Sequence, residues 1–480
     1  MTAPATTILE SLRACAGRLR ARLGDFWWYS LMLFCACRAA DLLNVFVGLW
    51  LVPKYVGPAE LGAVRPLTSF AEFLALPVTI FATTFMKEVT TLAARGEYGR
   101  MKSLMRGVFL GAGAFLVLAV AASRLLLPLF LERIRVVEGS LGFLILAAAF
   151  TGAVAPVYLN ALQALKRFKA ISVLNIVGAP VRLLAMAATM PFRALSGYFV
   201  GQAATPAFLI AASVYSLRRE LAAPAEPYWT RPVFRRFAAL FLCVAAYYGF
   251  GSLLSLVEQT VLRQRLPGVE SAAYYMTSRF SEIAGFVACT LTAVIFPFSA
   301  GLANEGRPTR PLVVRSSLVM LAAGGALALV FAFAGRPVLA LLPDGDAYAG
   351  YAWAIPWLVG VTTLTAIQTL HLTTEIAAGR FGFLKWWAPV HLVFAAGLLL
   401  TTGYGYFESL LPAAWSGFLA VHNFVSLKAM LWWFTATAAV KMAFVAAELL
   451  RQGPRCGEAG QSPRCGEAGQ SPLLKTIAAP

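Results

Sequence analysis

Two charged side chains stand inside an apolar stretch near the start of the chain, where "FCACRAADLLNVF" (residues 34–46) places Arg38 and Asp41 three positions apart. On a helix this spacing puts both side chains on one face, so they can form an ion pair. A guanidinium that meets one carboxylate still has donors free for a phosphate, and carboxylates are natural sites for a proton or a coupling cation. These residue types therefore indicate binding of an ion or of a charged substrate.

Similar charges recur in other apolar stretches of the chain. The full set is Arg38, Asp41, Arg65, Glu72, Arg182, Glu258, Arg279, Glu282 and Lys441. A charge in the middle of a membrane span costs roughly 2.5–3.5 kcal/mol on insertion scales, so such residues normally face a bundle interior or a hydrated cavity. Two interpretations stay open. The charges form local pairs, as Arg279 and Glu282 can at a spacing of three, or they line one common cavity.

In the second interpretation the two signs have different roles. The arginines bind an anionic substrate group, and they are Arg38, Arg65, Arg182 and Arg279. The remaining charges are candidates for coupling-ion sites or charge pairs, and they are Asp41, Glu72, Glu258, Glu282 and Lys441. Arg65 has a further alternative, because it lies near the start of its span and a long side chain there can reach the membrane surface. Arg182 follows Pro180 in mid-span, which makes it the stronger candidate.

The elements that must position these charges are membrane-spanning helices. The 480 residues are 59% hydrophobic and 13% charged, with a mean hydropathy of +0.72, which lies outside the range of soluble domains. Runs of about 20 apolar residues suit helices rather than the short alternating strands of a membrane barrel. The sequence predicts an all-α polytopic protein of about twelve spans. They lie at 26–52, 63–86, 104–131, 139–164, 171–191, 197–217, 237–262, 271–300, 312–334, 350–376, 386–402 and 427–450.

The basic residues predict the orientation of the chain, because Lys and Arg are retained on the cytoplasmic side of short loops. With the N-terminus inside, 26 of the 40 Lys and Arg residues fall in inside segments and 7 in outside segments. Both termini are then cytoplasmic. The net charge of +18 is explained by loops that face anionic lipid, so it does not indicate a nucleic-acid partner.

An internal repeat divides the chain into two lobes. At an offset of 210, "PAELGAVRPLTSFAEF" (58–73) aligns with "GVESAAYYMTSRFSEI" (268–283), which pairs Glu60 with Glu270, Phe70 with Phe280 and Glu72 with Glu282. Two six-span lobes related by an axis along the membrane normal are typical of transporters with a site at the lobe interface. The predicted parts are a basic segment (1–25), an N-lobe (26–217), a cytoplasmic linker (218–236), a C-lobe (237–450) and a tail (451–480) with a duplicated nine-residue unit.

Catalytic and metal-binding patterns are poorly represented. The three histidines, His371, His391 and His422, do not have a helical metal-ligand spacing, and the cysteines form no common zinc pattern. The chain has no phosphate-cradling P-loop, which argues against ATP-driven transport by this chain alone. The sequence therefore predicts a protein that is not an enzyme and needs no cofactor or metal.

Four segments carry a family resemblance. They are "VPKYVGPAELGAVRPLTSFAEF" from 52, "LQALKRFKAISVLNIVGAPVRLLA" from 162, "RLPGVESAAYYMTSRFSEIAGFVACTLTAVIFPFSAG" from 265 and "TEIAAGRFGFLK" from 374. Together they resemble the oligosaccharide flippases, which are the Wzx-like polysaccharide transporters of the multidrug/oligosaccharidyl-lipid/polysaccharide (MOP) superfamily.

The resemblance implies an alternating-access carrier in the cell inner membrane. Its substrate would be an undecaprenyl-pyrophosphate-linked oligosaccharide used for surface polysaccharide such as O-antigen, capsule or exopolysaccharide. Its partners would be membrane lipids and the polysaccharide polymerase and chain-length components. Related lipid-precursor flippases line a cationic cavity with arginines of spans 1, 2 and 8, the spans that hold Arg38, Arg65 and Arg279 here. This chain departs from that pattern because Asp41, Glu72, Glu258 and Glu282 accompany the arginines.

Two alternatives belong to different functional classes. A cation-coupled multidrug antiporter of the same superfamily would use Asp41 or Glu258 for its coupling ion and accept an organic cation. A membrane scaffold in polysaccharide assembly would transport nothing and would tolerate loss of the arginines.

Overall fold

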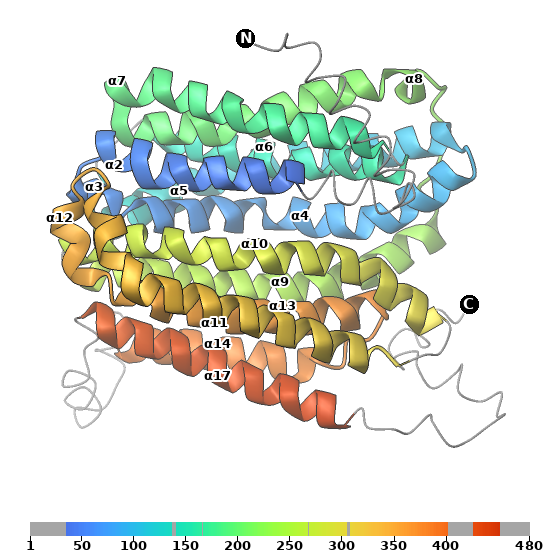
Figure 1. Ribbon diagram of the computed structural model, residues 1–480. Helices are drawn as coiled ribbons and strands as arrows, with labels where there is room; N and C mark the ends of the chain where they lie inside the picture. Colours follow the sequence, from blue (N-terminus) through green and yellow to red (C-terminus); the bar gives the residue numbers. More distant parts are fainter. Residues whose placement is uncertain are drawn as a thin grey trace, which may run out of the picture.

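The computed structural model describes residues 35–136, 141–165, 167–266, 268–304, 308–401 and 426–451, and most of them are helical (Figure 1). No strand occurs within these ranges. Nine helices in the described part of the chain are long and apolar enough to cross a membrane. The predicted all-α membrane fold is therefore confirmed. The predicted basic segment (1–25) and residues 452–480 of the predicted tail lie outside the described residues.

The first six predicted spans correspond to five continuous helical segments. These are Cys35–Tyr55, whose last part comprises η1 (Val47–Leu51) and α2 (Val52–Tyr55), then α4 (Val64–Ala94), α5 (Tyr98–Arg133), α6 (Leu141–Ala164) and α7 (Phe168–Ser216). α7 holds two predicted spans, 171–191 and 197–217, because the backbone leaves the helical region at Arg193 and Ala194. The two limbs fold against each other, since the Thr205 hydroxyl donates to the Gly178 carbonyl at 3.3 Å.

The other six predicted spans correspond to six further helices. They are α9 (Arg231–Arg265), α10 (Gly268–Asn304), α11 (Arg310–Ala340), α13 (Ala354–Ala377), α14 (Leu384–Thr401) and α17 (Leu427–Arg451). The difference between twelve predicted spans and nine candidates has three sources: α7 contains two limbs, and α10 and the short α14 are not among the nine. Four short helices connect the long ones, namely α3 (Pro58–Leu61), α8 (Arg218–Leu221), α12 (Gly345–Tyr348) and η2 (Ala349–Tyr351).

The long helices form two groups. In the N-terminal bundle, α6 packs against α4, α5 and α7. Buried alanines on α6, among them Ala149, Ala153 and Ala161, keep its surface smooth, so neighbouring helices can approach closely. In the C-terminal bundle, α13 packs against α10, α11 and α17, and α14 packs against α9 and α17. The residue limits assigned to the lobes and the linker stay predictions.

The two bundles meet along α4 and α9, and again where α3 contacts α10. We call the two ends of the molecule the α3 end, which also carries α12, and the α8 end (left and right in Figure 1). At the α3 end the bundles are in direct contact at Gly62 and Ser271. A Cβ added to Gly62 would lie 2.2 Å from the Ser271 hydroxyl oxygen, so only glycine fits there.

Candidate functional site

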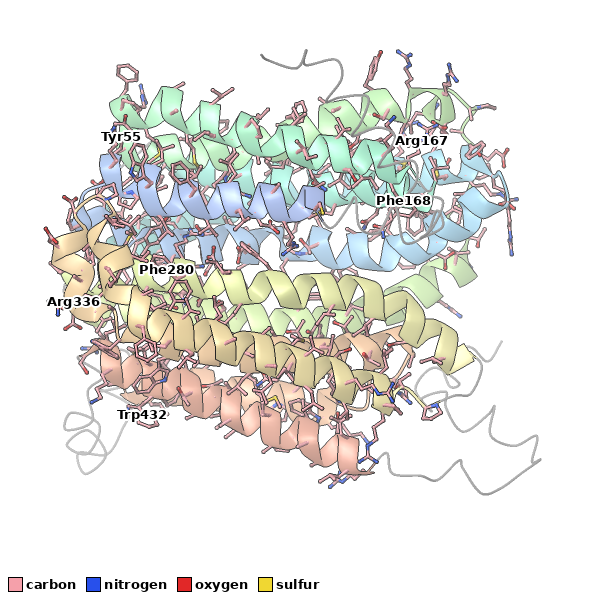
Figure 2. The ribbon with its side chains drawn as sticks, viewed as in Figure 1. Tyr55, Arg167, Phe168, Phe280, Arg336 and Trp432 are labelled. Carbon is pink, nitrogen blue, oxygen red and sulfur yellow. The ribbon has the colours of Figure 1, made fainter. Side chains whose placement is uncertain are left out.

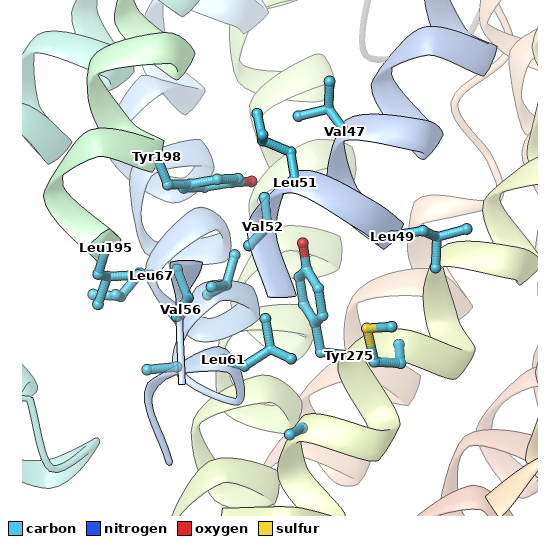
Figure 3. Close-up of a cluster of buried hydrophobic side chains, with 14 of the residues drawn as sticks. Val47, Leu49, Leu51, Val52, Val56, Leu61, Leu67, Leu195, Tyr198 and Tyr275 are labelled. Atoms are coloured by element: carbon cyan, nitrogen blue, oxygen red, sulfur yellow. The ribbon is translucent and has the colours of Figure 1, made fainter. Parts of the chain in front are cut away.

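The site begins at a break in the first helix. The turn at Val47–Leu51 is π-helical, so each carbonyl accepts from the N–H five residues later. The residue five positions after Gly48 is Pro53, which has no N–H, so the Gly48 carbonyl has no backbone donor. The Tyr275 hydroxyl on α10 donates to this carbonyl at 3.2 Å. Gly48 also lets Arg279 lie close, because an added Cβ would be 3.2 Å from its Cδ and Nε. Figure 3 shows Tyr275 beside this segment, within a cluster of buried apolar side chains.

A network of charges joins α4 to α10. Arg65 donates through Nη2 to Glu282 Oε1 at 2.5 Å and to the Ser278 hydroxyl at 2.9 Å. Arg279 donates through Nη1 to both Glu282 oxygens, at 3.0 and 3.1 Å. The predicted pair of Arg279 and Glu282 is therefore present. The interpretation of Arg65 as a residue that reaches the membrane surface is wrong, because a carboxylate of the other bundle holds its guanidinium.

Arg38 brings the first helix to the same part of α10. Its Nη2 lies 3.0 Å from Asp41 Oδ2, which is the pair that the spacing of three predicts. Its Nη1 donates to the Phe286 carbonyl at 2.8 Å, and its guanidinium lies 5.2 Å from the centre of the Phe286 ring. Phe286 is one helical turn beyond Glu282, so both charge networks follow one stretch of α10.

Arg182 of α7 completes the group of arginines. The charges of Arg279 and Glu282 act on it, and so do the hydroxyls of Tyr198 and Tyr275. The Arg182 side chain is half-buried, and its Nε is inaccessible to solvent without a hydrogen-bond partner. In the described part of the chain Arg182 forms no ion pair with a carboxylate. Its guanidinium thus has donors that the described residues do not use.

Glu72 occupies the α4 position that the repeat aligns with Glu282. The charges of Arg65, Arg279 and Glu282 all act on it. Its side chain is nevertheless exposed, and it has no hydrogen bond or ion pair within the described residues. Charged side chains within membrane spans normally face a hydrated cavity, so we expect a hydrated space beside α4 and α10 at Glu72. We call this set the interface charge cluster: Arg38, Asp41, Arg65, Glu72, Arg182, Arg279 and Glu282.

Glu258 and Lys441 form a separate site inside the C-terminal bundle. Lys441 is the cation that acts on Glu258, and its Nζ lies 5.4 Å from the centre of the Trp387 ring. His391 stacks beside Trp387 and is 2% exposed. Both Glu258 and Lys441 are half-buried, and no direct ion pair joins them among the described side chains. Neither residue makes a direct contact with the other seven predicted charges among the described side chains.

Several residues of the site were not among the predicted ones. Tyr275 holds the first helix, and Ser278 holds Arg65. Tyr198 lies beside Arg182 and accepts a hydrogen bond from Gln202 at 2.5 Å. One signal could have found two of them. Positions 271, 275, 278 and 282 of α10 are all polar and follow the spacing of one helix face.

The arrangement can bind and neutralise charge. Four guanidinium groups and three carboxylates gather at the meeting of the bundles, and two of those carboxylates are already paired with arginine. Among the described residues no group of three His, Cys, Asp or Glu side chains could hold a metal ion. The site thus offers guanidinium donors, one open carboxylate and aromatic hydroxyls.

Comparisons with known proteins identify the fold. No family model matches the chain, and no curated protein matches it. Among solved structures it is similar to the MATE multidrug transporter DinF-BH, with a TM-score of 0.60 and 14% identity over 88% of this chain and 94% of that one. It is also similar to the Vibrio cholerae MATE transporter VcmN (TM-score 0.58, 15% identity, 91% and 98% covered). A MOP superfamily transporter from Pyrococcus furiosus matches with a TM-score of 0.55 and 14% identity over 88% and 95%.

These likenesses show the fold and, at such identities, nothing finer. The chain has the fold of the MOP superfamily transporters.

Proposed function

We propose that the protein is an alternating-access transporter whose substrate carries an anionic phosphate group. The substrate class we propose is a lipid-linked pyrophosphate oligosaccharide, moved across the inner membrane for surface polysaccharide synthesis. One observation carries the proposal: arginines of both bundles converge on one stretch of α10, and Arg182 among them has no carboxylate partner in the described structure.

Arginine suits this substrate for geometric reasons. A planar guanidinium binds two oxygens of a phosphate at once, and it stays charged at any physiological pH. Asp41 and Glu282 hold Arg38, Arg65 and Arg279 in place. Arg182 would then supply the free charge that meets the pyrophosphate. The prenyl tail would remain in lipid while the sugars pass through the hydrated space.

The state of the molecule fits a transport cycle. The bundles are closed at the α3 end, where Gly62 meets Ser271. The positive-inside rule predicts that this end faces outward, so the closed end would be the periplasmic one. Substrate would enter from the cytoplasmic side, and the seam at the α3 end would open to release it. Glu72 is our candidate for the coupling proton or cation, because it is exposed and has no direct partner among the described residues.

A second candidate function is cation-coupled multidrug antiport. The fold comparisons by themselves favour it, because the similar solved structures include proteins described as multidrug transporters. The open carboxylate of Glu72 would then meet an organic cation, with Glu258 as a second cation site. The Pyrococcus furiosus relative is described as having a binding pocket of reverse polarity, which supports the view that this fold accepts substrates of either sign.

One experiment separates these functions. The gene is depleted, and lipid-linked oligosaccharide in the inner leaflet and tolerance to cationic dyes are measured together. We expect lipid-linked oligosaccharide to accumulate after depletion. Expression of the Arg182→Gln variant should not reverse this accumulation, although the variant is inserted normally. Arg336→Gln is the matched control, since Arg336 is an exposed arginine at the α3 end that does not belong to the interface charge cluster (Figure 2). Unchanged lipid with lost dye tolerance would support antiport, and no change in either would support a scaffold.

A further inference from the structure

A cavity at the α3 end lies apart from the interface charge cluster. It has a volume of about 570 Å³ and is lined by Ala59, Glu60, Arg135, Val136, Arg263, Leu266 and Gly268. The first four belong to the N-terminal bundle and the last three to the C-terminal bundle. The cavity therefore exists in this form only while the two bundles are closed at this end.

One wall is a buried arginine with neutral partners. Arg263 is 7% exposed, and it donates through Nε to the Ile134 carbonyl at 3.2 Å and through Nη2 to the Ala59 carbonyl at 2.5 Å. No carboxylate forms an ion pair with it within the described residues. A buried charge without an opposite charge is costly, so an anion in the cavity would stabilise this arrangement.

The second wall of the cavity also carries a positive charge. Arg135 is exposed, and its positive charge acts on Arg263. Arg135 also has a left-handed backbone with φ of +59°, at the position after the α5 cap where glycine is the usual residue. An arginine costs about 1 kcal/mol more than glycine in that conformation. The chain thus has a charged side chain beside the cavity at a position where the backbone conformation favours glycine, which has no side chain.

Among the described residues that line the cavity, one is acidic, and it does not neutralise the two arginines. Glu60 is exposed and acts on Arg263 through space, but it forms no ion pair in the described part of the chain. Two arginines against one carboxylate leave the cavity cationic. Its volume lies in the range of small-molecule sites, which is larger than a bare phosphate requires.

We infer that this cavity binds a phosphate group, free or on a small alcohol or sugar, and that the bound anion holds the α3 end closed. The two guanidinium groups come from opposite bundles, so the anion would bridge them. A ligand that contacts both bundles only in the closed state shifts the population towards that state. This inference does not depend on which substrate the interface charge cluster carries.

The test uses the full chain in a neutral detergent. Binding of inorganic phosphate and of glycerol phosphate is measured by calorimetry, with chloride at equal ionic strength as the reference. We expect saturable binding that raises the melting temperature. Arg135→Gln should raise the half-saturating concentration about tenfold, the effect of losing one charge-assisted hydrogen bond. Arg336→Gln, which removes a charge at the same end outside the cavity, should bind like the native protein.

A second variant tests the dependence on closure. Gly62→Ala alters no charge, but its methyl group would press on Ser271 and would lie 3.1 Å from Arg263 Nη1, so it disturbs the contact between the bundles together with the Arg263 wall. It should weaken phosphate binding as strongly as Arg135→Gln does. A third arm compares nanodiscs of phosphatidylglycerol and phosphatidylcholine. If lipid supplies the phosphate, only phosphatidylglycerol should stabilise the native protein, and Arg135→Gln should lose that stabilisation. Identical responses of the native protein and Arg135→Gln to every phosphate source would overturn the inference.

Discussion

Glu72 and Glu282 are the carboxylates that the predicted repeat aligns, and their surroundings differ. Glu282 is bound by Arg65 at 2.5 Å and by Arg279 at 3.0 Å. Glu72 is exposed and has no direct partner among the described residues. The same residue type at matched places on α4 and α10 thus serves as an anchor in one bundle and stays open to solvent in the other.

The scaffold around these positions is more alike. Phe70 of α4 stacks on Phe130 of α5 with 4.4 Å between ring centres, and Phe280 of α10 packs on Phe331 of α11 at 5.2 Å. Each pair joins the second and third long helix of its bundle. Each bundle thus places an aromatic pair at the positions that the predicted repeat aligns, whereas the aligned carboxylates have different partners. A difference between the two carboxylates is expected at a functional site, because one carboxylate must hold the arginines while the other stays available for a ligand.

The largest expected effect is a loss of stability when Glu282, which anchors two arginines, is replaced. Glu282→Gln leaves Arg65 and Arg279 without a carboxylate, and we expect the free energy of unfolding to fall by about 2 kcal/mol. That is less than the roughly 3–5 kcal/mol of a fully buried pair, because Glu282 is 30% exposed. Glu72→Gln is the matched control and should change stability by less than about 0.5 kcal/mol. Chemical denaturation in detergent measures both, and equal losses would show that the two carboxylates do not differ.

The charge pair of the C-terminal bundle should show the next largest effect. Lys441→Met leaves Glu258 half-buried without its cation, and we expect a loss of about 2 kcal/mol. The double variant with Glu258→Gln should recover most of it, since neither charge then remains. A double-mutant cycle of unfolding free energies gives the coupling. Additive losses would mean that the two residues act independently.

Arg182 should affect transport and leave folding unchanged. Arg182→Gln removes the guanidinium that has no carboxylate partner in the described structure, so we expect substrate affinity to fall about tenfold, as for one charge-assisted hydrogen bond. The melting temperature should stay within a degree or two of the native value. A variant that melts much earlier would indicate that Arg182 belongs to the scaffold instead.

The smallest effects test the shared packing. Phe70→Leu and Phe280→Leu each remove one aromatic pair, which contributes about 0.5–1.5 kcal/mol beyond its buried area. We expect the two losses in unfolding free energy to agree within about 0.5 kcal/mol. Phe333→Leu is a suitable control because Phe333 is exposed on α11. A clear difference between the two bundles would contradict the equivalence of these positions.

The sequence was sufficient for the helices because each long apolar run must be helical in a bilayer. The spacing of three also predicted both local ion pairs, Arg38 with Asp41 and Arg279 with Glu282. It did not predict the partner of Arg65, since contacts between bundles depend on how helices rotate and cross. Helix rotation and crossing also decide which charges lie together. The sequence therefore does not distinguish Glu258 and Lys441, which lie within one bundle, from the other charges.

The contact between Gly62 and Ser271 has a consequence for the membrane itself. At this seam a bare backbone meets a short hydroxyl with the buried Arg263 guanidinium beside them, so even a small separation of the bundles would break the contact. Such a seam would let a channel of charged groups exist in the bilayer without dissipating the proton gradient. Gly62→Ala should make proteoliposomes leak protons, and a dye-based gradient assay would detect the loss.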